Sequence, residues 1–380
     1  MIFLRAIACI ALIFAGLFSP AGAAPCVAGG RGFSLEPVAI GALPGMDAGQ
    51  GAALEAWRRH CAVTPSGKNL PELNAAAWRR ACVAAQGAQP APDFFRRRFQ
   101  AYRVVPETAP DAFFTGYYQP EILGSLTASR EFPIPVYARP PDLVTTARLP
   151  GLTAARRGAG AALEPYPDRG AIEDGALAGT PGLHTLVFLR DNADLFLAQV
   201  QGSARVRLPD GRVCHLSFAG RNGQPYTAIA RILVLRGVAT PEQMTMPRLI
   251  EWLRANGLQK GEAGDDLLRE NRSFVFFAGR IDRSAEQPRG GSGIVLTPLR
   301  SIAVDKTFWP YGLPFFIDAA LPWRTDAPEP FRRVMIAQDT GSAIVGPGRA
   351  DIYFGLGDAA GLRAGALRHH GQLYLLLPKE

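Results

Sequence analysis

The chain has 380 residues, of which 48% are hydrophobic and 19% are charged, a composition that excludes an intrinsically disordered protein. This length predicts two domains. The formal net charge of +8 serves either solubility or attraction to an anionic polymer. Because the arginines are dispersed and no helix-turn-helix, zinc-finger or RNA-recognition signature occurs, we expect no nucleic-acid partner.

The first residues have the pattern of an export signal. A short basic start precedes the apolar run 6–18, and an Ala-x-Ala cleavage site follows, so we predict a signal peptide at residues 1–24. The apolar run is too short to anchor the chain in a membrane. Cys26 raises the alternative of an outer-membrane lipoprotein, but Pro25 occupies a position where lipidation needs a small residue. We therefore expect an exported, soluble periplasmic protein.

Four cysteines remain after removal of the signal, and export makes disulfides possible. The pattern Ala-Trp-Arg-Arg-x-Cys occurs twice, ending at Cys61 and at Cys82, within two Ala-rich amphipathic segments. This repeat predicts two neighbouring helices joined by a Cys61–Cys82 disulfide. A second bond, Cys26–Cys214, remains an alternative. No Cys/His spacing is typical of a metal site, so we expect neither a metal nor a cofactor.

The first predicted element in the chain is a helical N-terminal segment, residues 25–99. Short β-like runs separated by Gly and Pro follow from Ala112 onwards. We predict strands at 134–137, 186–189, 195–201 and 213–218. Two helices are then expected, one over 226–236 and one from a capping box at Thr240 through Ala255. The β pattern returns after 273 and continues to 377.

Three polar clusters precede the C-terminal third. Tyr117 and Tyr118 lie in Phe114–Ser125, where aromatic faces and hydrogen-bonding groups suit a sugar ring, although core tyrosines at a strand end would give the same composition. Gln199–Ser203 reads as a strand that leads into a small-residue turn. Asn222 and Tyr226 flank a turn at a helix start, which an ordinary Asn-Gly turn also explains.

The C-terminal third places aspartates at the ends of apolar segments. Asp305 ends one such segment, and Asp339 and Asp351 bracket a Gly-rich loop. Loops carried by buried strands commonly hold functional residues. The run Asp339-Thr-Gly-Ser matches the signature of aspartic proteases, but that mechanism needs a second such motif, and the chain has none.

A series of motifs in chain order carries a resemblance. The motifs are Gly116-Tyr-Tyr-x-Pro, Val200-Gln-Gly-Ser203, Ala219-Gly-x-Asn-Gly-x-x-Tyr226, Ser273-Phe-Val-Phe-Phe277, Val304-Asp305…Pro310-x-Gly312 and Asp339-x-Gly…Asp351-Ile-Tyr-x-Gly355. Together they resemble the membrane-bound lytic murein transglycosylase A family over residues 110–380. The C-terminal third resembles the three-aspartate (3D) domain, whose namesakes fall on Asp305, Asp339 and Asp351.

The resemblance implies a mainly β fold with some α structure. A double-psi β-barrel catalytic domain would comprise residues 100–130 and 273–380. A second β-rich domain that binds substrate would be inserted at 131–272, with the polysaccharide in the groove between the two.

The resemblance also implies a reaction. Family enzymes are lyases, peptidoglycan lytic exotransglycosylases, that cleave the β-1,4 bond between N-acetylmuramic acid and N-acetylglucosamine without water. The C6 hydroxyl of the muramyl residue attacks C1 and forms a 1,6-anhydro ring. Because this nucleophile belongs to the substrate, one carboxyl can serve first as acid and then as base.

The motif match assigns the acid/base role to Asp351. Its carboxyl must begin protonated, so its pKa must be raised by burial or by a like charge, for which Asp339 is the natural neighbour. Asp305 would hold the loop. We expect Arg349 to point outward, since an inward guanidinium would oppose the shift. Glu121 is a weaker candidate for a second carboxylate.

The resemblance further implies a set of substrate-binding residues. They are Tyr117, Tyr118, Gln201, Gly202, Ser203, Asn222, Tyr226, Lys306, Gly341 and Tyr353. The expected partner is the glycan strand of peptidoglycan, bound by a monomer that could join outer-membrane or cell-wall complexes. Two alternatives remain open: a hydrolytic glycoside hydrolase with Asp339 as base, and a non-catalytic protein that only binds the wall.

Overall fold

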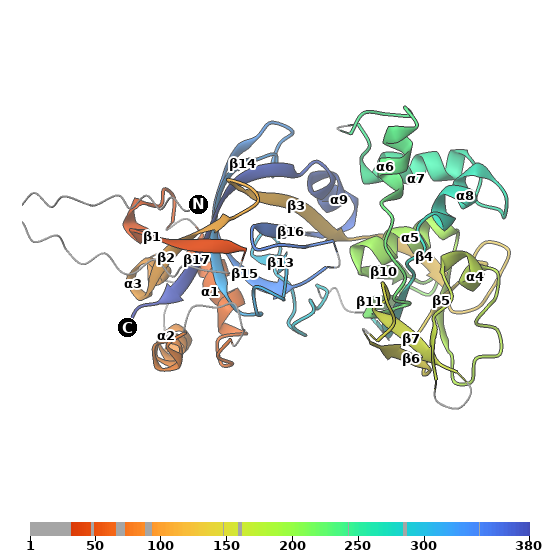
Figure 1. The fold of residues 1–380 in the computed structure, drawn as a ribbon, viewed down its shortest axis with the longest axis horizontal. Helices are drawn as coiled ribbons and strands as arrows, with labels where there is room; N and C mark the ends of the chain where they lie inside the picture. Colours follow the sequence, from red (N-terminus) through yellow and green to blue (C-terminus); the bar gives the residue numbers. More distant parts are fainter. Residues whose placement is uncertain are drawn as a thin grey trace, which may run out of the picture.

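The computed structural model describes residues 32–46, 49–65, 73–87, 93–146, 148–158, 162–241, 243–283, 287–341 and 343–380. The predicted signal peptide and Cys26 lie outside these residues. The described chain is a mixed α/β protein with more strand than helix, arranged as two lobes (Figure 1). None of the helices in the described ranges is both long enough and apolar enough to cross a membrane.

The first lobe contains an eight-stranded sheet with the order β1-β2-β17-β14-β15-β13-β16-β3. Its strands are β1 (Phe33–Val38), β2 (Phe99–Pro106), β3 (Ala112–Gln119), β13 (Ser301–Val304), β14 (Pro314–Leu321), β15 (Glu329–Asp339), β16 (Arg349–Leu356) and β17 (Arg368–Pro378). Because β17 also pairs with β3, the six strands from β17 through β3 close into a ring. Closure leaves these six strands without a free edge.

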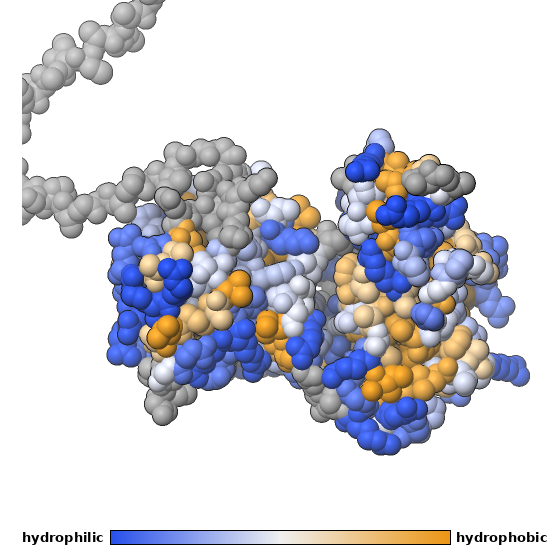
Figure 2. Space-filling view, turned by 90° about the horizontal axis from the view of Figure 1, so that it is seen from below, coloured by the Kyte–Doolittle hydropathy of each residue, from blue (hydrophilic) through white to orange (hydrophobic). Residues whose placement is uncertain are grey.

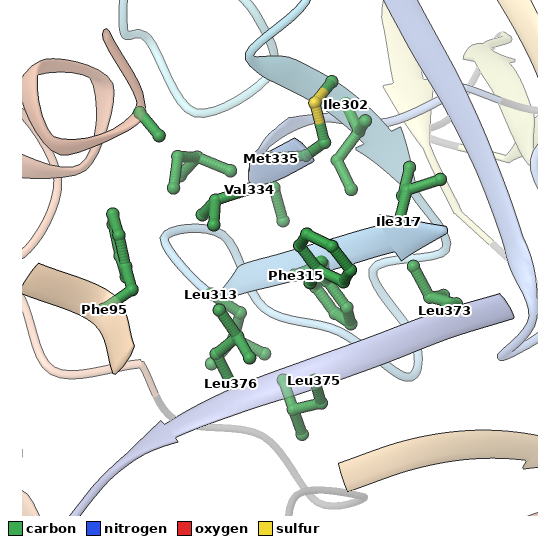
Figure 3. Packing of buried hydrophobic residues seen from close by; sticks show 14 of the residues in the cluster. Phe95, Ile302, Leu313, Phe315, Ile317, Val334, Met335, Leu373, Leu375 and Leu376 are labelled. Atoms are coloured by element: carbon green, nitrogen blue, oxygen red, sulfur yellow. The ribbon is translucent and has the colours of Figure 1, made fainter. Parts of the chain in front are cut away.

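Helices cover the outside of this sheet. They are η1 (Ile40–Ala42), α1 (Gln50–Arg58), α2 (Ala75–Gly87), α3 (Phe94–Arg98) and α9 (Gly357–Gly365). The run Val334–Ala337 of β15 is buried throughout, as expected for a strand that faces the ring interior on one side and is covered by α1 on the other. Apolar side chains from β13, β14, β15 and β17 converge in the core (Figure 3).

The second lobe contains a six-stranded sheet with the order β12-β11-β10-β4-β9-β5, and a small sheet of β6, β7 and β8. The strands are β4 (Glu121–Ser125), β5 (Ile134–Tyr137), β6 (Leu143–Thr145), β7 (Ala154–Arg157), β8 (Leu163–Pro165), β9 (Thr185–Leu189), β10 (Ser203–Arg207), β11 (Val213–Arg221) and β12 (Val275–Asp282). The helices are α4 (Arg169–Glu173), α5 (Asn192–Gln201), α6 (Ile229–Leu235), α7 (Met246–Ala255) and α8 (Ala263–Arg269).

Several elements differ from the sequence-based expectations. Residues 195–201 belong to helix α5, capped by the Asp191 side chain, and not to a strand. The N-terminal segment includes strand β1, which pairs with β2. Strands β4 and β12 pair within the second lobe, so its sheet begins before 131 and ends after 272. The strand pairings depend on partners distant in sequence, which local patterns do not report, whereas the Asp191 cap of α5 is a local signal that the sequence analysis missed.

The helix that the Thr240 capping box was expected to open begins later. The Thr240 and Gln243 side chains do exchange hydrogen bonds with each other's backbone amides. The helix itself, α7, starts at Met246 with Thr245 as its N-cap. Pro241 and Gln243 lie in turns ahead of this helix.

The two helices of the repeated Trp-Arg-Arg motif lie side by side, and Cys61 and Cys82 form a disulfide, the pairing that the repeat predicts. Trp57 and Trp78 are both fully buried and pack edge to face, with ring centroids 5.3 Å apart. The Trp78 indole donates a hydrogen bond to the Cys61 carbonyl at 2.8 Å. Cys214, the other half of the alternative bond, is buried in the second lobe and unbonded among the described residues.

The double variant Cys61→Ala/Cys82→Ala is expected to lose about 3 kcal/mol of unfolding free energy, because the bond closes a loop across a sequence separation of 21. Urea denaturation followed by tryptophan fluorescence measures this loss. Cys214→Ala controls for removal of a buried cysteine outside the bond. A loss below about 1 kcal/mol would show that tryptophan packing alone holds the two helices together.

Candidate active site

Two aspartates and a threonine lie in one row across the ring of the first lobe. Ala303 of β13 is directly opposite Asp339 on one side and Asp351 on the other. Asp351 is in turn opposite Thr115 of β3. Because directly opposite residues point to the same face, the two carboxyl groups share a face, and the side chain of Ala303 between them is only a methyl group.

Asp339 is held by three hydrogen-bond donors. Its Oδ1 accepts from the backbone amides of Gly291 at 2.8 Å and Thr340 at 2.9 Å, and its Oδ2 accepts from the Tyr117 hydroxyl at 2.9 Å. Burial raises the pKa of Asp339 above its ordinary value, and these three bonds offset only part of that rise. All three donors favour the ionised form of this carboxyl.

Asp351 has a different environment. Its Oδ1 accepts a hydrogen bond from the Thr115 hydroxyl at 2.5 Å, and its Oδ2 makes no hydrogen bond within the described part of the chain. Burial raises the pKa of Asp351 to about 6, and the negative charge of Asp339 adds to the rise. The Thr115 hydrogen bond and the Arg349 charge oppose it. The side chain retains some exposed surface, so Asp351 is a carboxyl that can exchange a proton near neutral pH.

Two tyrosines lie beside the aspartates on the same face. Tyr117 and Tyr353 are opposite each other on β3 and β16, with ring centroids 5.2 Å apart. Burial, with the nearby Asp339 charge, holds the pKa of both phenols well above the ordinary range. Both therefore stay protonated: Tyr117 donates to Asp339, and Tyr353 donates to Gln287 at 2.7 Å.

Asp305 supports the loop between the two other aspartates. Its Oδ2 accepts from the Gly346 amide at 2.8 Å, and its Oδ1 accepts from the amide and hydroxyl of Thr307. The side chain is buried. Asp305 thus joins the turn after β13 to the Gly-rich loop and does not stand in the row of Asp339 and Asp351.

The expectation that Arg349 points outward is wrong. Its Nη2 donates to the Thr115 hydroxyl at 2.6 Å, and its Nη1 donates to the carbonyl of Ala350 at 2.8 Å. The guanidinium also lies over the Phe113 ring, 5.0 Å from its centroid. Arg349 shares the face of Asp351 because alternate residues of a strand point the same way.

Asn222 is a structural residue, which corrects its expected role in binding. It is fully buried, and its amide nitrogen donates to the carbonyls of Pro167 and Arg272, each at 2.9 Å. Its oxygen accepts from the backbone amides of Gln224 and Phe274. No donor or acceptor is left for a sugar.

The Gly-Tyr-Tyr motif splits between the two faces of β3. Tyr118 points away from the aspartates and packs on helix α9, where Gly361 leaves no room for a Cβ against the ring. The Tyr118 backbone amide donates to Gln201 Oε1 at 3.1 Å, which ties the second lobe to the first. Gly202 caps helix α5 in the left-handed conformation, and Ser203 is buried at the start of β10.

The remaining expected residues lie outside the row. Lys306 is exposed on the turn after β13, and Gly341 lies in the loop after β15. Tyr226 is 44% exposed on the second lobe. Glu121 pairs with Arg205 and Arg207, and no contact in the described ranges brings it to the aspartates.

The surface is hollowed between the two lobes (Figure 2). Strand β3 carries Thr115 and Tyr117 and continues directly into β4 of the second lobe (Figure 1). Arg205 of β10 is close enough to Tyr353 for its charge to lower the tyrosine pKa. The aspartates, tyrosines and Arg205 therefore gather near the junction of the lobes, where a long polymer could be held from both sides.

Sequence reasoning missed two donors at this site. Thr115 stands two residues before Tyr117, and strand alternation would have placed both on one face. Gly291 contributes only its backbone amide, and an added Cβ there would lie 2.4 Å from the Tyr311 hydroxyl. No side-chain pattern could have indicated that contact.

The chain matches two family models. One is described as the MltA specific insert domain and matches residues 113–278. The other is the 3D domain and matches residues 300–377.

Known protein sequences and solved structures are similar to this chain. The membrane-bound lytic murein transglycosylase A of Escherichia coli (strain K12) is 33% identical over 270 residues, which cover 69% of this chain and 65% of that protein. The match thus spans slightly less than two thirds of this relative's length. A membrane-bound lytic murein transglycosylase structure from Agrobacterium tumefaciens is 32% identical with a TM-score of 0.78, covering 90% of this chain and 97% of that one. A structure of E. coli MltA with bound chitohexaose is 25% identical with a TM-score of 0.66, covering 91% of this chain and 92% of that one.

Proposed function

Because the chain belongs to the membrane-bound lytic murein transglycosylase A family, we propose that it cleaves peptidoglycan glycan strands and leaves a 1,6-anhydromuramyl end. The E. coli relative was solved with chitohexaose, a short β-1,4-linked amino-sugar oligomer, which supports a glycan as the substrate. The basic net charge suits a wall polymer whose peptide stems carry carboxylates.

One observation carries the mechanism: the two carboxyl groups are not equivalent. Asp339 is committed to three donors, whereas Asp351 has one oxygen without a hydrogen bond among the described residues and a pKa raised to about 6. Asp351 would protonate the glycosidic oxygen, and the C6 hydroxyl would then attack C1 as Asp351 takes up its proton. Asp339, in its ionised form, would stabilise positive charge developing at the anomeric carbon.

The architecture that accompanies this function is a double-psi β-barrel formed by the closed ring, with the second lobe inserted between its strands. The ring has six strands and two parallel pairs, β13 with β15 and β3 with β16, which supports this assignment. We place the protein in the periplasm, exported by residues 1–24.

Digestion of purified sacculi, with mass analysis of the released muropeptides, tests the function. We expect products lighter by one water than those of a hydrolase, because an anhydro ring replaces the reducing end. The hydrolase alternative requires Asp339 to activate water, although both of its oxygens already accept hydrogen bonds from the protein. Products with reducing muramic acid would refute the transglycosylase, and binding without release would favour a wall-binding protein.

The rate of anhydromuropeptide release is expected to fall as the pH rises above about 6. Asp351 must be protonated at the start, and the protonated fraction drops about tenfold per unit above its pKa. Initial rates on soluble glycan strands between pH 4 and pH 9, a range of about five units around this pKa, measure the effect. A rate that stays constant up to pH 9 would exclude Asp351 as the acid.

A further inference from the structure

Asp351 is the end of a chain of hydrogen bonds that starts at an arginine. Arg349 Nη2 donates to Thr115 Oγ1 at 2.6 Å, and Thr115 Oγ1 donates to Asp351 Oδ1 at 2.5 Å. Thr115 comes from β3, whereas the other two residues come from β16, so the parallel pairing of these strands brings the three hydrogen-bonded groups together.

The hydrogens available on each group decide which group donates in each of these two hydrogen bonds. A guanidinium has no acceptor, so the Thr115 hydroxyl cannot donate to Arg349. The hydroxyl has one hydrogen, and its position between Arg349 and Asp351 directs that hydrogen to Oδ1. Oδ1 is therefore an acceptor whether Asp351 is ionised or neutral, and the proton of the neutral form belongs on Oδ2.

From this geometry we propose that Thr115 and Arg349 are positioning residues that fix the transferable proton of Asp351 on Oδ2. This inference rests on the acid/base role proposed for Asp351. In the first half of the reaction the Oδ2–H bond breaks as the glycosidic oxygen gains the proton and its bond to C1 breaks. In the second half C1 bonds to O6, and the C6 hydroxyl proton returns to Oδ2. The atoms balance, and no further reactant is needed.

Arg349 is held independently of Thr115. Its Nη1 donates to the Ala350 carbonyl at 2.8 Å and to the Phe113 carbonyl at 3.3 Å, and its guanidinium lies over the Phe113 ring. A change at Thr115 therefore leaves the arginine in place and removes only the link to Asp351. A Thr115 variant therefore tests the effect of the hydrogen bond to Asp351 separately from the placement of Arg349.

The other groups around Asp351 come from four strands. Asp339 on β15 raises its pKa through charge. Tyr117 on β3 and Tyr353 on β16 are neutral phenols beside it. Arg368 on β17 is directly opposite Thr115 in the sheet and donates to the Pro241 and Met244 carbonyls of the second lobe. Each remains when Thr115 is changed, so a shift in titration reports the lost hydroxyl.

Thr115→Val keeps the shape of the side chain and removes the hydroxyl. Loss of a hydrogen bond to the carboxylate disfavours the ionised form, so the alkaline limb of the pH–rate profile should move up by about one pH unit. The rate below the limb should fall about tenfold or more, because the acid is no longer oriented. Thr115→Ser retains the hydroxyl and should restore both the limb and the rate. Arg349→Met should move the limb in the same direction.

The readout is the initial rate of anhydromuropeptide release against pH, with urea unfolding and sacculus binding measured for each variant. A Thr115→Val limb that coincides with that of the wild type would overturn the proposal, even if the rate were lower at every pH. A Thr115→Ser variant that resembled Thr115→Val would also overturn it. Failure of the proposed function would look different: the wild type would release no anhydro products.

Discussion

Asp351→Asn is expected to lower the rate of anhydromuropeptide release by about a hundred- to ten-thousand-fold, the usual contribution of a positioned acid/base group. An amide of the same shape can still accept the Thr115 hydrogen bond at one oxygen, so the local packing is kept. It cannot give a proton to the glycosidic oxygen. The loss should therefore be in turnover, with binding to sacculi retained.

Asp326→Asn provides the matched control. Its carboxyl is 94% exposed and pairs with Arg363 on the surface, so neither activity nor stability should change measurably. Wall digestion that survives Asp351→Asn would remove the catalytic assignment. Lost sacculus binding in that variant would instead point to a disturbed groove.

Asp339→Asn is expected to lower the rate by about a hundredfold, because it removes the negative charge that faces the developing positive charge at the anomeric carbon. The asparagine oxygen can accept from the Gly291 and Thr340 amides, and the Tyr117 hydroxyl can turn to accept from the new amide nitrogen. The geometry of the site should therefore persist. The pH–rate profile adds a second readout: without the like charge the pKa of Asp351 falls, so the alkaline limb should move to lower pH.

The two aspartate variants together separate the enzyme hypotheses. A transglycosylase needs one acid/base, so Asp351→Asn should be the more severe change. In a hydrolase that used Asp339 to activate water, the Asp351→Asn and Asp339→Asn variants would lose activity about equally. An unchanged limb in Asp339→Asn would show that the two carboxyl groups are not electrostatically coupled. Tyr117→Phe is a useful companion, since it removes one donor from Asp339 and leaves the Asp351 contacts intact.

The second lobe is tied to the first by hydrogen bonds beside the site. Gln201 accepts from the Tyr118 amide, and Arg368 of the first lobe donates to two carbonyls of the second. Asn222 ties three segments of the second lobe through its four hydrogen bonds. Motif residues of the second lobe thus include Asn222, whose polar atoms are all used within the lobe.

Several parts of this protein could be predicted from the sequence because they depend on residues close together in the chain. The repeat ending at Cys61 and Cys82 indicated two matching helix faces within 21 residues, and the structure joins them. The loop between Asp339 and Asp351 was also recognisable, since apolar strands and Gly-rich turns are local patterns. The order of the motifs indicated the family.

The functional differences between these residues depend on contacts that no local pattern contains. Thr115 and Asp351 are 236 residues apart and meet only because the ring closes β3 against β16. The same closure turns Arg349 inward and commits Asp339 to donors from β3 and from the Gly291 turn. The sequence by itself determined the motifs that mark Asp339 and Asp351 and that favoured Asp351 as the acid/base. Only strand pairing across the ring decided how the two carboxyl groups differ in their hydrogen bonds, because the pKa and the free lone pairs of a carboxyl are set by its neighbours in space.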